Sequence, residues 1–421
     1  MATETRTLEA ELQRRISGEV RFDHYSRALY STDASIYQMD PVGVVIPRNP
    51  DEVAAVVDIC AAARVAVLPR GGGTSLAGQT VNHAVVLDFT KYMNSVVEVN
   101  PEERWVRAQP GITLDELNFH LRPHRLHFAP DPTTSNRATV GGAIGNNSSG
   151  SHSILFGKTS DHVKELDVVL SDGHPTIFQP LSGPALEAKL AQNNLEGSIY
   201  TNVARIAGQH REEIARRFPR IMRRVSGYNL DMMLEDGPTN LAKIIVGSEG
   251  TLATVTEAKL NLEPVPRAKA LAVLHFNDLI EAIEATVPIL EHGPSAVELV
   301  DRMILERSRE SPGFVRRTAF VEGDPQALLV VEFFGESEGE LRAKIDALKQ
   351  DMERRGLGFA CVPAVTPAQQ ADVWAIRSAG LGLLMSVKGD SKPLPFVEDT
   401  AVSPEKLPEF VRRFEEIVRE H

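Results

Sequence analysis

One short segment near the start of the chain carries the residue types that most directly suggest chemistry. Residues 69–79 read Pro-Arg-Gly-Gly-Gly-Thr-Ser-Leu-Ala-Gly-Gln and follow an apolar run at 65–68. The consecutive glycines have no Cβ and can adopt positive φ, so backbone N–H groups can come close to a phosphate. The hydroxyls of Thr74 and Ser75 add hydrogen-bond donors. The segment therefore indicates a site for a nucleotide cofactor.

Two further segments have a similar composition. Residues 139–150 consist mainly of glycine, serine and asparagine, and residues 247–251 read Gly-Ser-Glu-Gly-Thr. The wider stretch 130–162 has little periodicity, and we expect it to be a long functional loop anchored by Val140, Ala143 and Ile144. Three such segments in one domain favour a long, polar cofactor over a simple surface turn.

Two common nucleotide-binding motifs do not fit the glycine segment. A Rossmann fingerprint needs G-x-G-x-x-G at the start of a helix, whereas here the glycines lead to an apolar, strand-like run at 84–89. A P-loop needs Gly-Lys followed by Ser or Thr, and no such sequence follows. The cofactor site is therefore expected on a different fold.

Periodicity in the first half predicts short strands and helices that would position these segments. The strands are expected at 42–46, 65–68, 84–89, 95–99, 105–108 and 165–170. One helix is expected to begin at Asn49, with Pro50 at its first position and Glu52 three residues after the cap. A second helix is expected to begin at Thr113, with Glu116 at the capping-box position.

The second half changes to longer strands and helices. Strands are expected at 268–276, 296–300, 328–334 and 359–362, with helices from Asn277 and over 338–355. This order is βαββαβ, the ferredoxin-like pattern. We place a domain boundary near 264–267 and expect one more amphipathic helix from 403 onward.

Composition narrows the class of protein. The 421 residues are enough for two or three domains, and the net charge of −12 argues against a general nucleic-acid binder. Only Cys60 and Cys361 occur, which excludes an iron–sulfur or zinc-finger site inside this chain and fits a reducing compartment. The polar first twenty residues are no signal peptide, and no apolar run approaches the ~18 residues of a membrane span. We expect a cytoplasmic protein, with peripheral attachment to the inner face of the membrane left open.

Four stretches together resemble the vanillyl-alcohol-oxidase (PCMH-type) FAD-dependent oxidoreductases. They are 69–79, 130–132 with 138–150, 156–158, and 244–252. The resemblance covers nearly the whole chain and is specific to the branch of D-2-hydroxyacid dehydrogenases, D-lactate dehydrogenases and glycolate oxidase flavin subunits. It implies an α+β fold, with a FAD-binding domain at 1–267 made of two subdomains at about 35–95 and 96–267. A ferredoxin-like cap domain would follow at 268–421.

The resemblance also implies which residues hold FAD. The pyrophosphate would lie on the glycine loop, at Arg70, Gly71, Gly72, Gly73, Thr74 and Ser75, with Gly78 and Gln79 beside it. The isoalloxazine and ribityl side would be lined by Pro130, Thr139, Gly141, Gly142, Asn147, Ser148 and Gly150, and the rest of the cofactor by Ile244, Val246 and Glu249. Some relatives attach FAD covalently through a histidine in the glycine loop. Because Thr74 ends that stretch here, we expect noncovalent FAD.

Two basic residues are implied to bind the substrate. Arg377 would clamp the carboxylate of a 2-hydroxy acid, since a guanidinium matches a carboxylate in bidentate fashion, and Lys392 would assist. The alternative is a surface arginine at a helix end and a loop lysine. The neighbouring Glu398 and Asp399 are more easily explained as structural residues.

Two further residues leave alternatives open. Tyr228 could face the flavin or simply pack, and His152, two residues after Gly150, could lie near the flavin or be solvated. The histidines at 120, 124 and 127 lack metal-ligand spacing, so no metal site is predicted in this chain.

The chain departs from the family pattern at its end. Relatives carry, after a helix like the one expected from 403, a motif with two histidines that supply the base or bind a divalent metal. This sequence stops before that motif and before the strand that returns to the FAD domain. We therefore expect a C-terminally incomplete cap domain, with any divalent metal or iron–sulfur cluster in a missing C-terminal part. The chain alone is expected to bind FAD weakly and to turn over slowly or not at all.

The function that the resemblance implies is oxidation of a D-2-hydroxy acid of the D-lactate, glycolate or D-2-hydroxyglutarate type. Hydride would pass to the flavin, and the electrons would go on to a quinone, an iron–sulfur centre or another acceptor. The alternatives are another FAD oxidoreductase of the same fold, such as an alcohol or sugar oxidase or a cell-wall-precursor reductase, or a noncatalytic FAD-binding subunit. The oligomeric state, including a homo-oligomer, stays open.

Overall fold

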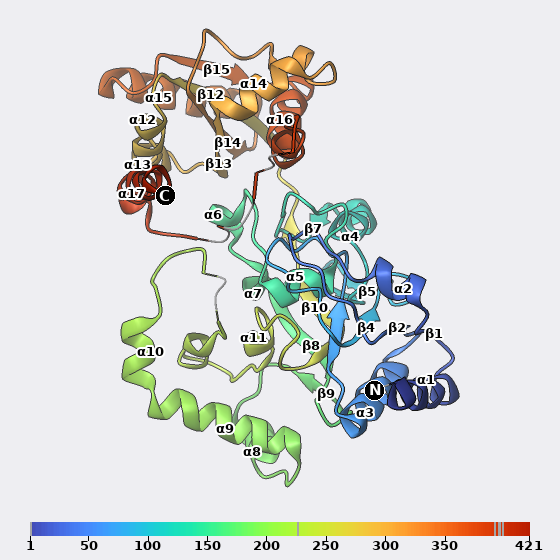
Figure 1. Cartoon of the computed structure of the whole chain (residues 1–421). Helices are drawn as coiled ribbons and strands as arrows, with labels where there is room; N and C mark the ends of the chain where they lie inside the picture. The colour runs from blue at the N-terminus through green and yellow to red at the C-terminus, as the bar shows by residue number, and fades with distance from the viewer. Residues whose placement is uncertain (1, 225–226, 391–392, 395–396, 398–399) are drawn as a thin grey trace. The chain divides into compact units, whose positions relative to one another are not determined.

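The computed structural model describes residues 2–224, 227–390, 393–394, 397 and 400–421 and divides into two compact units (Figure 1). The first unit comprises the chain up to Gly150 and Phe156–Pro264. The second comprises Ser151–Leu155, Val265–Leu394 and Thr400–His421. The short segment 151–155 thus belongs to the second unit, although the predicted boundary near 267 places it in the cofactor domain.

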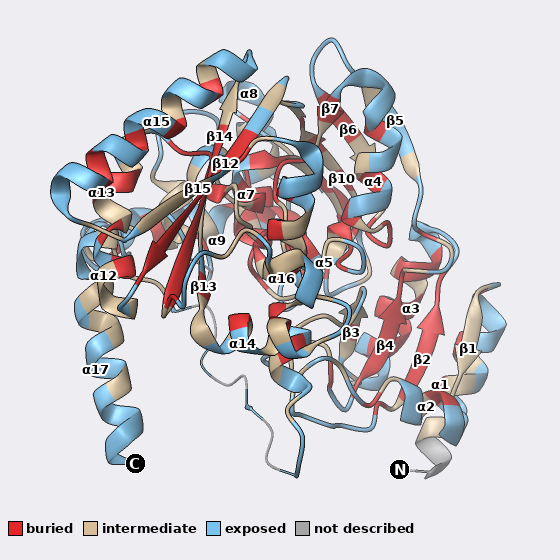
Figure 2. Ribbon diagram, turned by 90° about the horizontal axis from the view of Figure 1, so that it is seen from above, coloured by how far each residue is buried: buried red, intermediate tan, exposed pale blue. Residues whose placement is uncertain are grey.

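The first unit begins with a small sheet that carries the glycine segment. Its strands are β1 (Glu19–Arg21), β2 (Gly43–Ile46), β3 (Val67–Arg70) and β4 (Val85–Asp88), in the order β1-β2-β4-β3. The last three are parallel, and β1 is antiparallel to β2. Helices α1 (Ala2–Arg15), α2 (His24–Leu29) and α3 (Pro50–Ala63) accompany this sheet. Figure 2 shows β2 and β4 in the buried colour, as expected for parallel strands covered on both faces.

Local signals explain where these helices begin. Asn49 caps α3 by accepting a hydrogen bond from the backbone N–H of Glu52, and Pro50 is its first residue, as predicted. The side chain of Glu52 does not complete a capping box, because it accepts hydrogen bonds from Ser17 and from the N–H of Arg48. Thr113 and Glu116 do form the predicted capping box at α4 (Leu114–Leu121).

A second, antiparallel sheet completes the first unit. Its strands are β5 (Val96–Asn100), β6 (Trp105–Ala108), β10 (Thr254–Asn261), β8 (Val163–Val169) and β9 (Pro175–Phe178), in that spatial order. The hairpin of β5 and β6 was predicted, whereas β9 and β10 were not. Burial alternates residue by residue along β10, so one face packs on a core cluster that includes Leu117, Val140 and Ile144.

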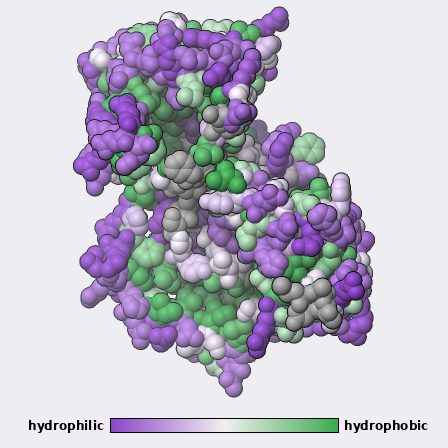
Figure 3. Space-filling view, viewed as in Figure 1, coloured by the Kyte–Doolittle hydropathy of each residue, from purple (hydrophilic) through white to green (hydrophobic). Residues whose placement is uncertain are grey.

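The remaining elements of the first unit are shorter or more peripheral. They are β7 (Leu126–His127), β11 (Glu263–Pro264), α8 (Gly183–Leu190), α9 (Leu195–Gln209), α10 (Arg211–Arg217) and α11 (Ala242–Ile245). On the face drawn in Figure 3, apolar side chains gather between α9 and α11, where the core of the second sheet reaches the surface. Partly buried side chains such as Ile199, Val203 and Met233 belong to that core.

The prediction that 130–162 forms a long loop was wrong in its secondary structure. This stretch contains three short helices, α5 (Val140–Asn146), α6 (Ser153–Phe156) and α7 (Thr159–His162). Thr139 caps α5 by accepting a hydrogen bond from Gly142 N–H, and the anchors Val140, Ala143 and Ile144 are buried. Glycine and asparagine are weak helix formers, so the tertiary packing of these anchors overrides local propensity.

The second unit has the predicted ferredoxin-like order. Its antiparallel strands are β12 (Ala268–Phe276), β13 (Ala296–Asp301), β14 (Ala327–Gly335) and β15 (Ala360–Ala364), arranged β13-β14-β12-β15. One face packs on α12 (Leu279–Glu284), α13 (Thr286–Leu290) and α15 (Glu338–Arg355). The other face packs on α14 (Arg302–Glu310) and α16 (Pro367–Met385), neither of which was predicted. Helix α17 (Leu407–Glu420) contacts α12.

None of the helices in the described part of the chain combines the length and the apolar character that crossing a membrane requires.

A buried histidine in this unit generates a testable pH dependence. His275 on β12 is fully buried; its Nδ1 lies 3.0 Å from the Val273 carbonyl oxygen, and its Nε2 accepts the N–H of Glu322 at 3.1 Å. Burial lowers the pKa of His275. The unfolded chain therefore takes up a proton here before the folded chain does. We expect the free energy of unfolding to fall as the pH drops below about 6.5, with a slope of up to about 1.4 kcal/mol per pH unit.

The variant His275→Gln should reduce this slope in urea unfolding followed by circular dichroism between about pH 8 and pH 5, because the titrating group is gone. The exposed His83→Gln serves as the matched control. An unchanged slope in His275→Gln would show that other groups cause the loss of stability in acid.

Candidate functional site

The glycine segment packs directly against the start of α5. Strand β3 ends at Arg70, and Gly73 and Gly78 then adopt positive φ of 64° and 83°. A Cβ on Gly71 would lie 2.2 Å from Thr139 Oγ1, and a Cβ on Gly72 would lie 2.2 Å from the carbonyl oxygen of Arg137. Only glycine permits this approach, so the first two predicted cofactor segments lie side by side.

The third segment meets the other two at the same place. The N–H of Gly247 donates to the carbonyl of Ile144 (2.9 Å), and the N–H of Glu249 donates to the carbonyl of Gly145 (3.0 Å). A Cβ on Gly250 would lie 3.3 Å from Pro69 Cδ, at the base of the glycine loop. The fold thus brings together three segments that are far apart in the sequence.

Residues between 130 and 160 form a further part of this site. A Cβ on Gly150 would lie 2.2 Å from Asp131 Oδ1, so Gly150 packs on Asp131, the residue that follows the predicted Pro130. Asn147, with a positive φ of 52°, accepts the N–H of Ser160 on its Oδ1 (2.9 Å), and the carbonyl of Ser148 accepts the Thr159 hydroxyl (2.7 Å). These bonds fix the turn after α5.

Gly141 and Gly142 are packed less evenly. A Cβ on Gly141 would lie 2.7 Å from Pro110 Cβ, whereas a Cβ on Gly142 would lie 3.3 Å from Thr139 Oγ1. Gly141 thus packs tightly on Pro110, whereas Gly142 is bound by the cap of α5 through its N–H.

The sequence interpretation missed the residues at 30–37 that hold the glycine loop. The guanidinium of Arg70 donates to the carbonyls of Tyr30, Thr32 and Thr80, at 3.3, 2.7 and 2.9 Å. The N–H of Ala34 donates to the carbonyl of Gly73 (3.0 Å). Burial lowers the pKa of Arg70. Arg70 therefore braces the loop through these carbonyls, and the pyrophosphate contact that the resemblance implied for Arg70 stays a prediction.

Tyr30 extends this support. Its hydroxyl donates to Asp88 Oδ2 (2.5 Å), and Arg70 lies over its ring at 5.4 Å. Asp88 is the register partner of Arg70 at the ends of β4 and β3. No periodicity or glycine pattern marks residues 30–37, because their role comes from contacts with residues 38 or more positions away.

The other predicted cofactor residues differ in what they present. Ser75 donates to Gln79 within the loop. Ile244 and Val246 are buried in the core of the second sheet, so their side chains pack within the protein. Tyr228, a residue with two open roles, bonds through its hydroxyl to Thr251 Oγ1 (2.9 Å) and so joins the third segment.

The residues present fit an elongated polar cofactor such as FAD. Two buried hydroxyls, Ser160 Oγ and Ser248 Oγ, have no hydrogen-bond partner within the described residues. Ser248 lies in the third segment, and Ser160 is bonded to Asn147 after the second. Buried polar atoms without partners are rare in native proteins, which indicates that a polar ligand completes this region.

In the second unit, Arg377 lies on α16 with its side chain paired to a carboxylate. Nε and Nη2 both contact Glu298 Oε2 at 2.8 Å. Val373 and Ile376 are buried against the sheet, which fixes the helix face that carries Arg377. Lys392, Glu398 and Asp399 lie outside the described residues.

His152, for which a solvated position was one alternative, is largely buried in the second unit. Its side chain is 18% exposed, and its Nε2 lies 2.5 Å from Glu332 Oε2. Its ring stacks on Phe334 at 5.3 Å. Glu332 was not predicted, although it is a lone charge within the apolar run 328–334.

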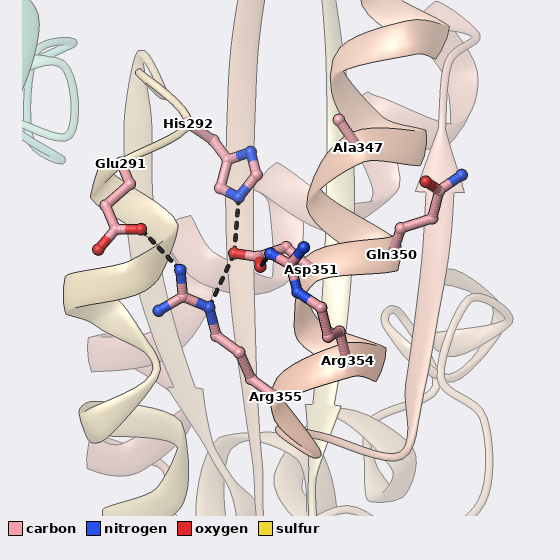
Figure 4. Close-up of a pocket in the computed structure, with 7 residues that line it drawn as sticks. All are labelled: Glu291, His292, Ala347, Gln350, Asp351, Arg354 and Arg355. Carbon is pink, nitrogen blue, oxygen red and sulfur yellow. Dashed lines mark hydrogen bonds and ion pairs between the residues drawn. The ribbon is translucent and has the colours of Figure 1, made fainter.

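A surface pocket also lies on the second unit, between the end of α13 and α15 (Figure 4). His292 and Arg355 both contact Asp351 Oδ2, at 3.1 and 3.0 Å, and Arg355 also contacts Glu291. These partners hold the pKa of Asp351 far below its ordinary value. The lining groups therefore pair with one another and tie α13 to α15, and the predicted site residues are not among them.

The glycine packing generates a prediction for FAD binding. In Gly72→Ala the new methyl group meets the main chain at Arg137, which must move together with the cap of α5. Because such overpacking costs about 1–3 kcal/mol, we expect FAD affinity to fall by roughly fivefold to a hundredfold. Flavin fluorescence quenching on titration of the apoprotein measures this.

Gly208→Ala on α9 is the matched control, because a Cβ there meets nothing within 4 Å. This variant should bind FAD as the original chain does. Equal FAD affinity in Gly72→Ala and Gly208→Ala would show that the loop does not hold the cofactor.

The sequence matches two known domain families. Residues 41–178 match the FAD binding domain, and residues 265–421 match the C-terminal domain of FAD linked oxidases. D-2-hydroxyglutarate dehydrogenase of Pseudomonas putida is 36% identical over 419 residues, which are 97% of this chain and 42% of that protein. The enzyme of the same name from Escherichia coli is 35% identical over 425 residues, again 97% of this chain and 42% of that protein.

A shorter relative is covered more fully. Glycolate oxidase subunit GlcD of Bacillus subtilis is 27% identical over 420 residues, which are 96% of this chain and 75% of that protein. The chain thus spans less than half of the length of the two dehydrogenases above.

Solved structures agree on the fold. Alkyldihydroxyacetonephosphate synthase superposes with a TM-score of 0.61 at 18% identity, covering 91% of this chain and 64% of that one. p-Cresol methylhydroxylase superposes with a TM-score of 0.62 at 14% identity, covering 90% and 72%. These findings confirm the predicted fold class and FAD as the cofactor of the family. The chain therefore carries a FAD binding domain followed by a C-terminal domain of the FAD linked oxidases, on the fold of the PCMH-type enzymes.

Proposed function

We propose that this chain carries the FAD site and the substrate-binding unit of a D-2-hydroxyacid dehydrogenase. The observation that carries the proposal is the match to proteins named D-2-hydroxyglutarate dehydrogenase over 97% of the chain at 35–36% identity. The convergence of the three glycine-rich segments supports it, because the fold assembles a place for an elongated cofactor in the unit that contains the FAD binding domain match.

D-2-hydroxyglutarate is the first substrate to test, followed by D-lactate and glycolate. The first four relatives carry the name of D-2-hydroxyglutarate, whereas more distant ones are named for D-lactate or glycolate. All three are 2-hydroxy carboxylates, so one basic residue that binds the carboxylate serves the whole class.

The cofactor residues divide into three groups. The backbone of 71–75 would hold the pyrophosphate, the side of 130–150 would face the flavin and ribityl groups, and 247–251 would close the remaining side. Arg70 would position the loop from behind through its carbonyl contacts. With Thr74 in place of a linking histidine, FAD would be held noncovalently.

The chemistry needs a hydride acceptor, an oriented substrate and a base. FAD, when bound, supplies the two-electron acceptor for the hydride that leaves C2 of the hydroxy acid. Arg377 would bind the substrate carboxylate, and Glu298 holds its guanidinium in place through Nε and Nη2. The hydroxyl proton passes to a general base as the 2-oxo acid forms. The electrons would then leave to a quinone, an iron–sulfur centre or another acceptor, in a cytoplasmic or peripherally membrane-bound protein.

The test is anaerobic reduction of the flavin in the FAD-loaded chain. Loss of the visible flavin absorbance after addition of D-2-hydroxyglutarate, D-lactate or glycolate, but not of the L-enantiomers of the first two, supports the proposal. Reduction by sugars or alcohols alone would replace it with another activity of the same fold. Failure to retain any flavin after FAD is added would contradict the proposal that this chain carries the FAD site, and the same failure in the full-length product would favour a noncatalytic role.

Arg377 gives a specific prediction. Charge-assisted hydrogen bonds contribute about 1.5–3 kcal/mol, so Arg377→Lys should lower kcat/KM for the 2-hydroxy acid by about tenfold to a hundredfold. Stopped-flow flavin reduction measures the effect, because it isolates the half-reaction with the substrate.

Arg342→Lys on the exposed side of α15 is the matched control and should leave the rate unchanged. A rate in Arg377→Lys equal to that of the control would exclude Arg377 from carboxylate binding.

A further inference from the structure

Residues 205–224, which we call the basic segment, carry a charge opposite to that of the whole chain. The segment contains seven arginines and two acidic residues, Glu212 and Glu213, in a chain whose net charge is −12. The arginines are at positions 205, 211, 216, 217, 220, 223 and 224, and all but the last are exposed. Positive charge is thus concentrated on one part of the surface of an otherwise acidic protein.

The basic segment lies at an edge of the first unit. It comprises the end of α9, the whole of α10 and the residues that follow, and Figure 1 shows α10 at the periphery of that unit. Ile214 is buried and anchors α10, whereas the side chains of Arg216 and Arg217 are 69% and 71% exposed. In Figure 3, hydrophilic side chains gather over α10. The segment therefore presents its guanidinium groups to the solvent.

The protein neutralises only part of this charge. Arg216 and Arg217 share Glu213, and the half-buried Arg224 pairs with Asp231. Arg211 and Arg220 have no ion-pair or hydrogen-bond partner among the described residues. Because like charges so close in the chain repel one another, an anionic surface that binds here gains from electrostatic attraction.

Apolar side chains are interleaved with the arginines. Residues 216–224 read Arg-Arg-Phe-Pro-Arg-Ile-Met-Arg-Arg. Met222 is 50% exposed, and Phe218 and Ile221 are half-buried. Lys158 holds this stretch by donating to the carbonyl oxygen of Met222, which leaves the Met222 side chain at the surface. Arginines mixed with exposed apolar groups are typical of protein surfaces that bind the headgroup layer of an anionic membrane.

We propose that the basic segment binds the surface of an anionic membrane. The guanidinium groups bind the phosphodiester oxygens of the lipid headgroups, and Met222 enters the boundary between headgroups and acyl chains. The same charges attract an acidic protein, but the apolar residues among the arginines favour the membrane. The net charge of the chain argues against nucleic acid. This inference goes beyond the proposed function and does not rest on it, because membrane binding is measured without turnover.

Cosedimentation of the whole chain with lipid vesicles tests the proposal. Vesicles of equal parts phosphatidylglycerol and phosphatidylcholine should bind the chain, whereas vesicles of phosphatidylcholine alone should not. The triple variant Arg211→Gln, Arg217→Gln, Arg220→Gln should bind the anionic vesicles about a hundredfold more weakly. Arg216 stays in place so that Glu213 keeps a partner. Added salt should weaken binding of the original chain, because it screens exposed charges.

The matched control is the triple variant Arg342→Gln, Arg413→Gln, Arg419→Gln. Each of these exposed arginines of the second unit pairs with a glutamate four residues earlier, and their replacement changes the net charge by the same amount. The control should bind the anionic vesicles as the original chain does, and both triple variants should keep the original Tm. Equal weakening in the two triple variants, or equal binding of the original chain to both kinds of vesicle, would contradict the proposal.

Met222→Ser distinguishes a membrane from an acidic protein as the partner. Loss of the apolar side chain should weaken binding to the anionic vesicles by about fivefold to tenfold. Soluble polyglutamate is the probe for an acidic protein. If the chain binds polyglutamate but not the anionic vesicles, the basic segment serves an acidic protein and the membrane proposal is wrong. Binding to neither probe would also overturn it.

Discussion

The cofactor side of this molecule depends on the absence of Cβ atoms at a few positions where main chains almost touch. Gly71 and Gly72 leave no space for a methyl group between the glycine loop and residues 137–139. Gly250 approaches Pro69 in the same way, and the N–H groups of Gly247 and Glu249 bond to the end of α5. Close approach of backbone is what a phosphate-bearing ligand requires, because it brings N–H donors to the surface of a narrow site. Any side chain at these glycines would separate segments that must act together.

The second unit uses a different constraint, a charge inside an apolar sheet. Glu332 lies among Val330, Leu328 and Leu271, where an unpaired carboxylate would cost several kcal/mol. His152 and Lys269 compensate the charge of Glu332. On the adjacent strand, Glu298 pairs with Arg377 and compensates the charge of its guanidinium. Side chains held in this way lose little freedom when a ligand arrives, so a sheet built for packing also presents ordered bases.

The glycine packing of the first unit and the buried charge of the second unit lie close together in the sequence. Gly150 ends the cofactor segment and packs on Asp131, and the next five residues belong to the second unit, where His152 pairs with Glu332. His152 therefore follows Gly150, whose backbone is proposed to line the flavin, by only two positions in the sequence. Separate domains are usually joined by an exposed linker, whereas here a short segment carrying a buried ion pair supplements the connection near 264.

The sequence by itself determined the family, the cofactor class and the order of elements in the second unit. These features are encoded locally: alternation and 3.6-residue periodicity predict strands such as 268–276 and the helix 338–355, and consecutive glycines mark close backbone approach. The tertiary structure decided the helices within 130–162, where Asn147 and Ser160 hold a glycine-rich stretch that has no apolar period. It also decided that Arg70 braces the loop against Tyr30 and Thr32, and that His152 meets Glu332 across 180 residues of sequence. Partners this distant leave no periodic trace, because their contact depends on how sheets and loops pack and not on the residues beside them in the chain.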